Sequence, residues 1–317
     1  MKIVDMHCDT ISAIYEKKEK ILVNSGHFDI KRALQAKIKV QVFALFTMPA
    51  EANNALRQIL KQLDKFNHEM ENNFEQLYQI HKYSDIENIA NQQKIGCLLH
   101  LEGGEALGTD PEILRILYKL GLRSLGLTWN NRNHLADGLY EGDKAGGLSL
   151  KGREIIAELN RLGIILDLSH LAEKGFYEAF EYYKYPIMVS HANARALCKH
   201  WRNLDDQQLK ILACNKGVVG VNQVADFVKE GKKSTLDDLI DHIIYIADLI
   251  GIEHVGLGSD FDGADNIVLT GVQGYIGLEK QLLKRGFSPK EADMVLGENA
   301  LRVIKAVIDN KEMPDGL

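Results

Sequence analysis

The feature that most constrains the fold of this chain is a repeated alternation of short apolar runs with longer amphipathic stretches. Most of the runs are continuously apolar, as expected of parallel strands that are buried on both faces. Eight such runs are predicted to be β-strands: residues 2–6, 40–46, 95–101, 123–128, 163–168, 186–190, 217–222 and 253–258.

Helical periodicity fills the intervals between these runs. The sequence Ser288-Pro289-Lys290-Glu291 predicts a helix start, with a serine cap, proline in the first turn and an acidic residue three positions after the cap. The long polar stretch 51–80 is expected to hold two helices. Further helices are predicted at 112–120, 150–162, 172–183, 205–215, 235–250, 274–285, 288–296 and 299–309.

Eight successive βα units predict an α/β fold, a (β/α)₈ TIM barrel, and 317 residues is an ordinary length for one. A doubly wound open sheet is the alternative that strand counting leaves open. We find no Gly/Ser linker, low-complexity tract or composition break, so residues 1–317 are expected to form one domain.

Composition indicates a globular protein, with 45% apolar and 26% charged residues. The formal net charge of −6 argues against nucleic acid or an anionic membrane as the main partner. The four cysteines form no C-x-x-C pair and are interpreted as reduced thiols. With no signal-peptide pattern and no apolar run long enough to span a bilayer, we expect a cytoplasmic protein. A homodimer is the expectation from base rates alone.

Active-site groups of a barrel lie at the carboxyl ends of its strands. Several predicted strands end in residues that bind metal ions or transfer protons: His7 and Asp9, Glu102, Trp129 and Asn130, His170, His191, Asn222, and Asp260 with Asp262. Scattered polar residues would rarely fall into this arrangement by chance.

Taken singly, these residues have simpler interpretations. His7-x-Asp9 places an imidazole and a carboxylate on one face of a strand, but a turn aspartate beside a surface histidine would look the same. His170 or His191 alone could be a hydrogen-bonded core histidine. Glu102 follows a buried strand, where an unpaired carboxylate is costly, so it needs either a buried arginine or a cation.

As a set, three histidines and two or three carboxylates without a cysteine ligand suit a divalent metal that binds nitrogen and oxygen. Zinc is the leading candidate, with manganese or cobalt as alternatives. Five ligands exceed the need of one tetrahedral ion and fit two ions about 3.5–4 Å apart, bridged by a carboxylate. Such a pair lowers the pKa of a bridging water to supply hydroxide and polarises a scissile carbonyl.

The motif order H-x-D, E-G-G, D-L-S-H, S-H, R-N and D-F-D-G resembles the membrane-dipeptidase family, peptidase family M19, from His7 to residues 299–303. The resemblance implies that His7 and Asp9 bind one zinc ion, that Glu102 bridges to a second, and that His170 and His191 complete the second site. It implies that Asp260 transfers a proton from the attacking water to the leaving amine. Arg202 would help to hold the substrate.

The sequence departs from the family pattern at one position. Better-known members carry a histidine after Leu-Thr, thought to steady the tetrahedral intermediate, whereas this chain has Trp129 after Leu127-Thr128. The candidates to replace that histidine are Trp129 itself through its indole N–H, Asn130, Asn131, His134 and Arg202. We expect the substrate to contact Arg202, Trp129, Asn130 and Asn222.

The first interpretation is therefore a zinc-dependent dipeptidase that hydrolyses free dipeptides, including L,D-dipeptides. A second is another amidohydrolase-type enzyme that cleaves a lactam, cyclic amide or ester; many such enzymes bridge their metals with a carboxylated lysine, and no strand-end lysine competes here with Glu102. A third is a catalytically inactive binding barrel, for which Trp129 is the sole support.

Overall fold

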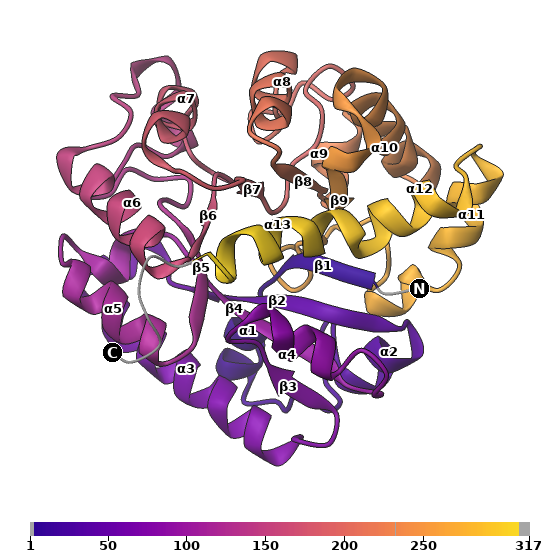
Figure 1. Ribbon diagram of the computed structural model, residues 1–317, viewed down its shortest axis with the longest axis horizontal. Helices are drawn as coiled ribbons and strands as arrows, with labels where there is room; N and C mark the ends of the chain where they lie inside the picture. Colours follow the sequence, from indigo (N-terminus) through magenta and orange to yellow (C-terminus); the bar gives the residue numbers. More distant parts are fainter. Residues whose placement is uncertain (1–2, 232, 311–317) are drawn as a thin grey trace.

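The strands close into a barrel. The computed structural model describes residues 3–231 and 233–310, so Lys2 of the first predicted strand lies outside the described residues. Within these residues, nine parallel strands form one sheet, and the pairing of β2 with β4 closes eight of them into a ring (Figure 1). This pairing, in register from Val40 opposite Gly96 to Phe46 opposite Glu102, confirms the TIM barrel and excludes the open sheet.

All eight predicted strands are present. They are β1 (Ile3–Cys8), β2 (Ile38–Phe46), β4 (Ile95–Glu102), β5 (Leu122–Gly126), β6 (Ile165–Asp167), β7 (Met188–Val189), β8 (Val218–Val221) and β9 (Val255–Leu257). Their order around the barrel is the order of the sequence, apart from β3 (Leu77–Gln79), which pairs with the start of β4 outside the ring.

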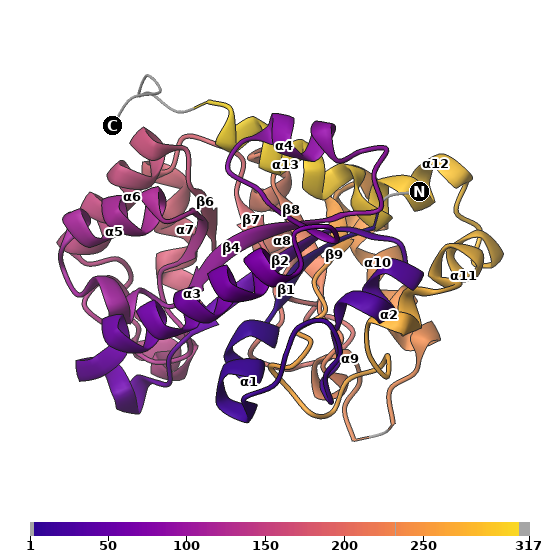
Figure 2. The same cartoon turned by 90° about the horizontal axis from the view of Figure 1, so that it is seen from below.

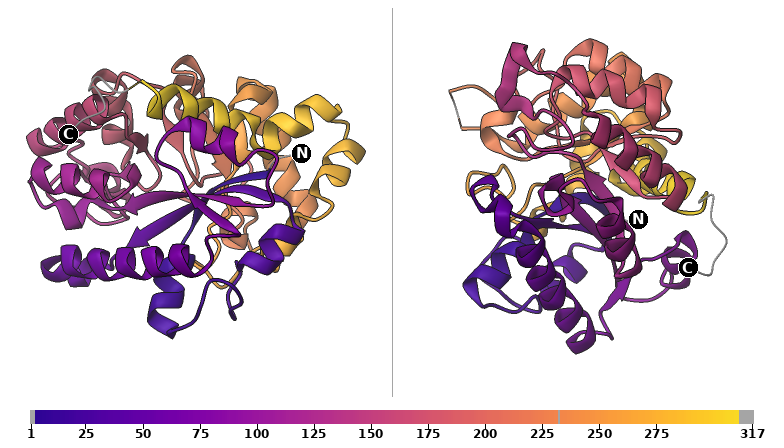
Figure 3. Two further views of the ribbon diagram at one scale, coloured as in Figure 1. Left: turned by 60° about the horizontal axis from the view of Figure 1, so that its bottom comes forward. Right: turned by 90° about the vertical axis from the view of Figure 1, so that its left-hand side faces the viewer.

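Helices surround the barrel, as Figures 2 and 3 show. The α-helices are α1 (Thr10–Lys17), α2 (Ile30–Gln35), α3 (Ala55–Asn72), α4 (Tyr83–Asn88), α5 (Pro111–Lys119), α6 (Leu150–Leu162), α7 (Glu173–Tyr182), α8 (Asp206–Cys214), α9 (Ala225–Val228), α10 (Leu236–Ile250), α11 (Leu278–Lys284), α12 (Pro289–Asp293) and α13 (Asn299–Ile308). Single 3₁₀ segments are Pro49–Asn54, Gly104–Leu107, Leu139–Lys144, Ile252–His254 and Val272–Tyr275, and Met294–Glu298 is a π-helical segment. Among the described residues, no helix has both the length and the apolar character that a membrane span requires.

Two predictions for the connecting segments were wrong. The stretch 51–80 contains one long helix, α3, instead of two. Its last part forms strand β3, because Leu77 to Gln79 pair with the start of β4. The helix predicted at 274–285 begins only at Leu278, because Gly277 before it adopts a left-handed φ of 89°. The predicted start at Ser288 is confirmed, since its side chain accepts a hydrogen bond from the Glu291 N–H and Glu291 returns one.

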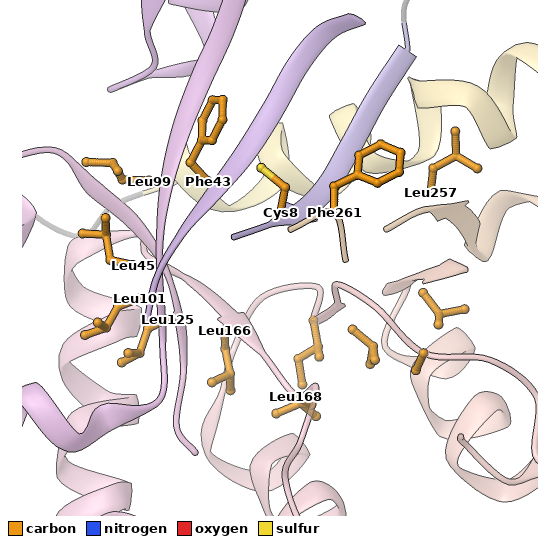
Figure 4. Packing of buried hydrophobic residues seen from close by; sticks show 14 of the residues in the cluster. Cys8, Phe43, Leu45, Leu99, Leu101, Leu125, Leu166, Leu168, Leu257 and Phe261 are labelled. Atoms are coloured by element: carbon orange, nitrogen blue, oxygen red, sulfur yellow. The ribbon is translucent and has the colours of Figure 1, made fainter. Parts of the chain in front are cut away.

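Strand alternation divides the core into two parts. On β4, Leu99 and Leu101 point outward and pack with other large apolar side chains against the helices, as Figure 4 shows. Leu98 points inward and packs in the lower barrel, which α13 closes with Val303 and Ile304. The carboxyl ends of the strands are therefore the end of the barrel left for a site.

Candidate metal centre

The inward face of β4 determines where Glu102 lies. Because Leu98 points into the barrel, the period of two along a strand directs His100 and Glu102 inward above it. Glu102 is 6% exposed and lies level with Phe46 of β2 and Gly126 of β5, at the upper rim of the barrel. A carboxylate at this depth needs a strong partner.

One group of possible metal ligands lies on the β1 side of Glu102. His7 Nε2 is 3.3 Å from Asp9 Oδ2 and 3.7 Å from Glu102 Oε2. His7 is fully buried, and neither of its ring nitrogens has a hydrogen-bond partner among the described residues. Buried imidazole nitrogens are rarely left unpaired, so this group fits a bound cation.

The second group lies on the opposite side of the same carboxylate. His170 Nε2 is 3.0 Å and His191 Nε2 is 3.7 Å from Glu102 Oε1. The two Nε2 atoms are 2.8 Å apart, so both imidazoles converge on one point. Ligand atoms of each group of three lie within 4.8 Å of one another, close enough to hold one ion.

Glu102 belongs to both groups, one oxygen facing each. The two groups offer imidazole nitrogens and carboxylate oxygens that could hold a metal ion, and Glu102 is shared between them. His7, Asp9, His170 and His191 are thus brought together where the sequence predicted them, from strand ends separated by up to 184 positions.

Burial and the neighbouring charges shift the pKa values of this cluster. Burial opposes the charged form of His7, but the carboxylates of Glu102 and Asp9 outweigh it and raise the pKa of His7 to about 10. Burial raises the pKa of Glu102 well above its usual range. Burial, with Arg202 and His7 nearby, lowers the pKa of His170 and His191 well below theirs. The last two are therefore neutral imidazoles, the form that binds metal.

Two of these candidate ligands, both histidines, are oriented by partners on their other ring nitrogen. His170 Nδ1 is 2.7 Å from Asn130 Oδ1, an acceptor, so Nδ1 carries the proton and Nε2 presents its lone pair. His191 Nδ1 is 2.7 Å from Ser190 Oγ. The Ser190 hydroxyl itself donates to Asp167 Oδ2, so its oxygen accepts from His191 and again leaves Nε2 free.

A layer of buried polar residues supports these histidines and was not predicted from the sequence. Asp167 is 1% exposed, accepts the backbone N–H groups of Ser169 and Ser190 at 2.9 Å, and lies below the metal ligands. His100 Nε2 is 3.6 Å from Asp167 Oδ2, and His100 Nδ1 is 2.9 Å from Ser124 Oγ. Counting back by two from Glu102 on its strand would have revealed His100, and the aspartate of D-L-S-H would have revealed Asp167.

Three residues of the site have a strained backbone conformation. His170, Asp260 and Asp262 have φ values of 66°, 63° and 66°, in the left-handed region that non-glycine residues rarely adopt. A side chain at Gly263 would put Cβ 2.3 Å from Asp9 Oδ2 and 2.5 Å from Asp260 Oδ1, so the loop after β9 can press against these carboxylates only as glycine. Such strained conformations persist only where the surrounding structure holds them in place.

Asp260 and Arg202 flank the two ligand groups. Asp260 Oδ1 is 4.0 Å from His7 Nε2, and its Oδ2 accepts a hydrogen bond of 3.0 Å from Asn222 Nδ2. Arg202 is 3% exposed; its Nη2 is 3.2 Å from His170 Nε2 and donates to the His191 carbonyl at 3.1 Å. Asn222, which was expected to contact the substrate, is fully buried and is not among the residues that line the cavity; its side chain donates to Asp260 and accepts the Val224 N–H.

A cavity of about 910 Å³ opens above these residues. Trp129 and Asn130 line it, together with Asp9, Glu102, Arg202 and Asp260. Asn131 and His134 lie on the same loop, where His134 is exposed and its carbonyl accepts from Ser149. The volume is at the upper end of small-molecule sites, so a substrate the size of a dipeptide fits beside the metal groups.

Comparisons with known proteins show which family the chain is similar to. The family model described as membrane dipeptidase (peptidase family M19) matches residues 1–314. A dipeptidase of Claviceps purpurea, tcpJ, is 31% identical over 306 residues, covering 92% of this chain and 72% of the relative. A dipeptidase of Aspergillus oryzae, aclJ, is 34% identical over 294 residues, covering 88% and 69%.

Solved structures show the same fold. A metallopeptidase from Rhodobacter sphaeroides, liganded with a phosphinate mimic of the dipeptide L-Ala-D-Ala, superposes with a TM-score of 0.91 at 25% identity, covering 97% of this chain and 99% of that one. A dipeptidase of peptidase family M19 superposes with a TM-score of 0.91 at 27% identity, covering 97% and 98%.

The hydrogen bonds below His191 make a testable prediction. Replacing Ser190 by Ala, or Asp167 by Asn, removes or weakens the acceptor that fixes the proton of His191 on Nδ1. We expect affinity for the second metal ion to fall by about 10- to 100-fold, as for other residues behind metal ligands, measured by zinc titration with a competing chelator. Asp85→Asn, at a buried carboxylate that accepts the His81 and Lys82 backbone N–H groups at the start of α4, is the control. Equal zinc affinity in all the variants would contradict the role given to Ser190 and Asp167.

Proposed function

The chain belongs to the membrane dipeptidase family, peptidase family M19, and is a metallodipeptidase, and we propose that it hydrolyses the peptide bond of free dipeptides at a site for two zinc ions. The observation that carries the proposal is the buried Glu102 carboxylate, which shares its two oxygens between the His7–Asp9 group and the His170–His191 group. Two ions held there would lower the pKa of a water between them and polarise the scissile carbonyl.

In this proposal, the side chains on either side of Glu102 hold the two metal ions in fixed positions. His7 and Asp9 hold one side, His170 and His191 the other, and Glu102 joins them. Because the imidazoles are already buried and oriented by Asn130 and Ser190, little reorganisation accompanies the reaction. Zinc fits this set of nitrogen and oxygen ligands best.

Asp260 is the proposed proton carrier. Its Oδ2 is held by Asn222, which leaves Oδ1 directed toward the ligand cluster, 4.0 Å from His7 Nε2. Burial raises its pKa above the ordinary range, which suits a carboxylate that accepts a proton and returns it. In this role Asp260 takes the proton of the attacking water and delivers it to the amine of the departing residue.

Arg202 is the proposed anchor for the substrate carboxylate. It lines the cavity. Burial lowers the pKa of its guanidinium, but the ordinary arginine pKa is so high that the group stays cationic. A buried guanidinium beside the ligand cluster attracts a carboxylate or a developing oxyanion. With Trp129 where relatives of this family carry histidine, Arg202 and the Trp129 indole N–H are the proposed groups that steady the tetrahedral intermediate.

Two features of the substrate follow from these roles. A dipeptide with a free amine and a free carboxylate fits a cavity with carboxylates on one side and Arg202 on the other. Dipeptides with a D-residue at the carboxyl end are included in the proposal, supported by the mimic of L-Ala-D-Ala bound to the Rhodobacter sphaeroides protein. The cytoplasmic location and the homodimer expected above stay predictions.

A substrate panel tests the proposal. Metal-free protein supplied with zinc should hydrolyse L-Ala-L-Ala and L-Ala-D-Ala, because both present the two terminal charges and one peptide bond. N-acetylated and C-amidated forms of the same dipeptides should be poor substrates, since each lacks one charge. Chelation should abolish turnover and zinc should restore it. Hydrolysis of a lactam or an ester without any dipeptide turnover would contradict dipeptidase function and favour the amidohydrolase interpretation.

The proposed role of Asp260 can be tested by substitution. Asp260→Asn keeps the shape and the contact with Asn222 but cannot carry the proton, so kcat should fall by about 10²- to 10⁴-fold. Zinc content should stay that of the unaltered protein. Asp226→Asn, an exposed aspartate at the start of α9, controls for loss of charge at this end of the barrel. If Asp260→Asn loses zinc in elemental analysis, Asp260 is a ligand instead of a proton carrier.

A further inference from the structure

The cavity above the ligand cluster has two chemically different sides. Going around the barrel, the ends of β9 and β1 supply carboxylates, namely Asp9, Asp260, Asp262 and Asp265. Across the cavity, the segments that follow β5 and β7 supply aromatic side chains and Arg202. Lys17 and Lys61 also reach the rim, on the side of α1 and α3.

Four aromatic side chains form a continuous wall, which we call the aromatic wall: Phe46, Trp129, Tyr140 and Trp201. Ring centroids are 5.5 Å apart for Phe46 and Trp129, 6.0 Å for Trp129 and Tyr140, and 5.2 Å for Tyr140 and Trp201. Neighbouring rings at these distances are in contact. All four line the cavity, although Phe46 is the last residue of β2, Trp129 and Tyr140 follow β5, and Trp201 follows β7.

The wall is not part of the hydrophobic core. Tyr140 is 58% exposed and Trp201 is 41% exposed, whereas core aromatics such as Phe43 and Phe176 are fully buried. Burying large apolar side chains is favourable, so adjacent exposed rings around a cavity indicate a surface that a ligand covers.

The wall is also held in place before any ligand binds. The Tyr140 N–H donates to the Asn130 carbonyl at 2.8 Å, and the Leu139 N–H donates to the His170 carbonyl at 3.1 Å. Gly138 permits this approach, because a Cβ there would lie 2.4 Å from the Trp129 carbonyl oxygen. The loop that carries Tyr140 is therefore joined to the loops that carry the metal ligand His170 and its partner Asn130.

The charges of the cavity orient a dipeptide relative to this wall. The free carboxylate is drawn to Arg202, which follows Trp201 in sequence and lies beside His170. The free amine is drawn to the carboxylates across the cavity. The residue that bears the carboxylate then lies on the side of Trp129, whose ring centroid is 5.9 Å from that of His170.

We propose that the aromatic wall binds the side chain of the carboxyl-terminal residue, so that the preferred substrates are dipeptides with a large apolar or aromatic residue at that position. This inference rests on the proposed dipeptidase function and on the role of Arg202 in it. It names the substrate class, which the metal ligands themselves do not select.

Two series of dipeptides test the proposal on the zinc-loaded protein. In Ala-X, with X as Gly, Ala, Leu or Phe, kcat/KM should rise with the size of X, and Ala-Phe should exceed Ala-Gly by about 10- to 100-fold, as expected for burial of a phenyl group. In X-Ala the same residues should change kcat/KM much less. A flat Ala-X series, or a steeper X-Ala series, would overturn the proposal.

Variants of the wall make the test specific. Tyr140→Ala and Trp201→Ala should each reduce the ratio of kcat/KM for Ala-Phe over Ala-Gly by about threefold to tenfold, because each removes part of the surface that covers the ring. Tyr140→Phe and Trp201→Phe keep a ring and should restore most of the ratio. Phe74→Ala, which removes a phenyl group 66% exposed and outside the cavity lining, should leave the ratio unchanged. An unchanged ratio in both alanine variants would overturn the proposal.

The outcome remains informative if dipeptidase function fails. Hydrolysis of Ala-Gly and Ala-Phe at equal rates supports the proposed dipeptidase function and contradicts the proposed role of the aromatic wall. If no dipeptide is turned over, binding of the same dipeptides to the zinc-loaded protein is measured by calorimetry. Tighter binding of Ala-Phe than of Ala-Gly, with the difference lost in Trp201→Ala, supports the role of the aromatic wall without the dipeptidase function. Equal or absent binding of the two dipeptides overturns it.

Discussion

The buried carboxylate of Glu102 is the constraint on which the rest of the site depends. At 6% exposure and with an imidazole group on each side, it cannot stay charged without positive charge close by. Protons are one source of that charge, as the raised pKa of His7 indicates, and divalent ions are a stronger one. The candidate ligands on both sides, their buried partners and the strained residues after β6 and β9 surround this one group, and the proposed function places a cation on each side of it.

The barrel places Glu102 at this depth because alternate residues of each strand point inward and form layers along the barrel axis. Inward residues change along the strands from apolar at the bottom, such as Leu98, through polar in the middle, such as His100 and Asp167, to ligands at the top, such as Glu102. The apolar layer and α13 close one end, so the polar layer is supported from below, and the cavity lies above it. Substrate selection is then left to the loops above the ligands, where the aromatic wall lies.

Much of this was predictable from sequence because parallel strands that are buried on both faces leave a strong apolar signal. The eight strands and the meeting of their polar ends follow from that signal and from the barrel rule. Strand β3 was missed, because three residues that pair at an edge look like the end of the preceding helix. Asp167 and Ser190 were missed as partners of His191, since their role depends on which side chains meet inside the barrel. The aromatic wall joins residues from three strand ends, and no local pattern connects Phe46 with Trp201.

Metal content per chain, measured by elemental analysis on the unaltered protein and on Glu102→Ala, tests the central claim most directly. If Glu102 joins two cation positions, the protein supplied with zinc should hold about two ions, and the variant, shown by circular dichroism to be folded, should hold one or fewer. No bound metal after zinc is supplied, or the same content in both proteins, would contradict the account of this site.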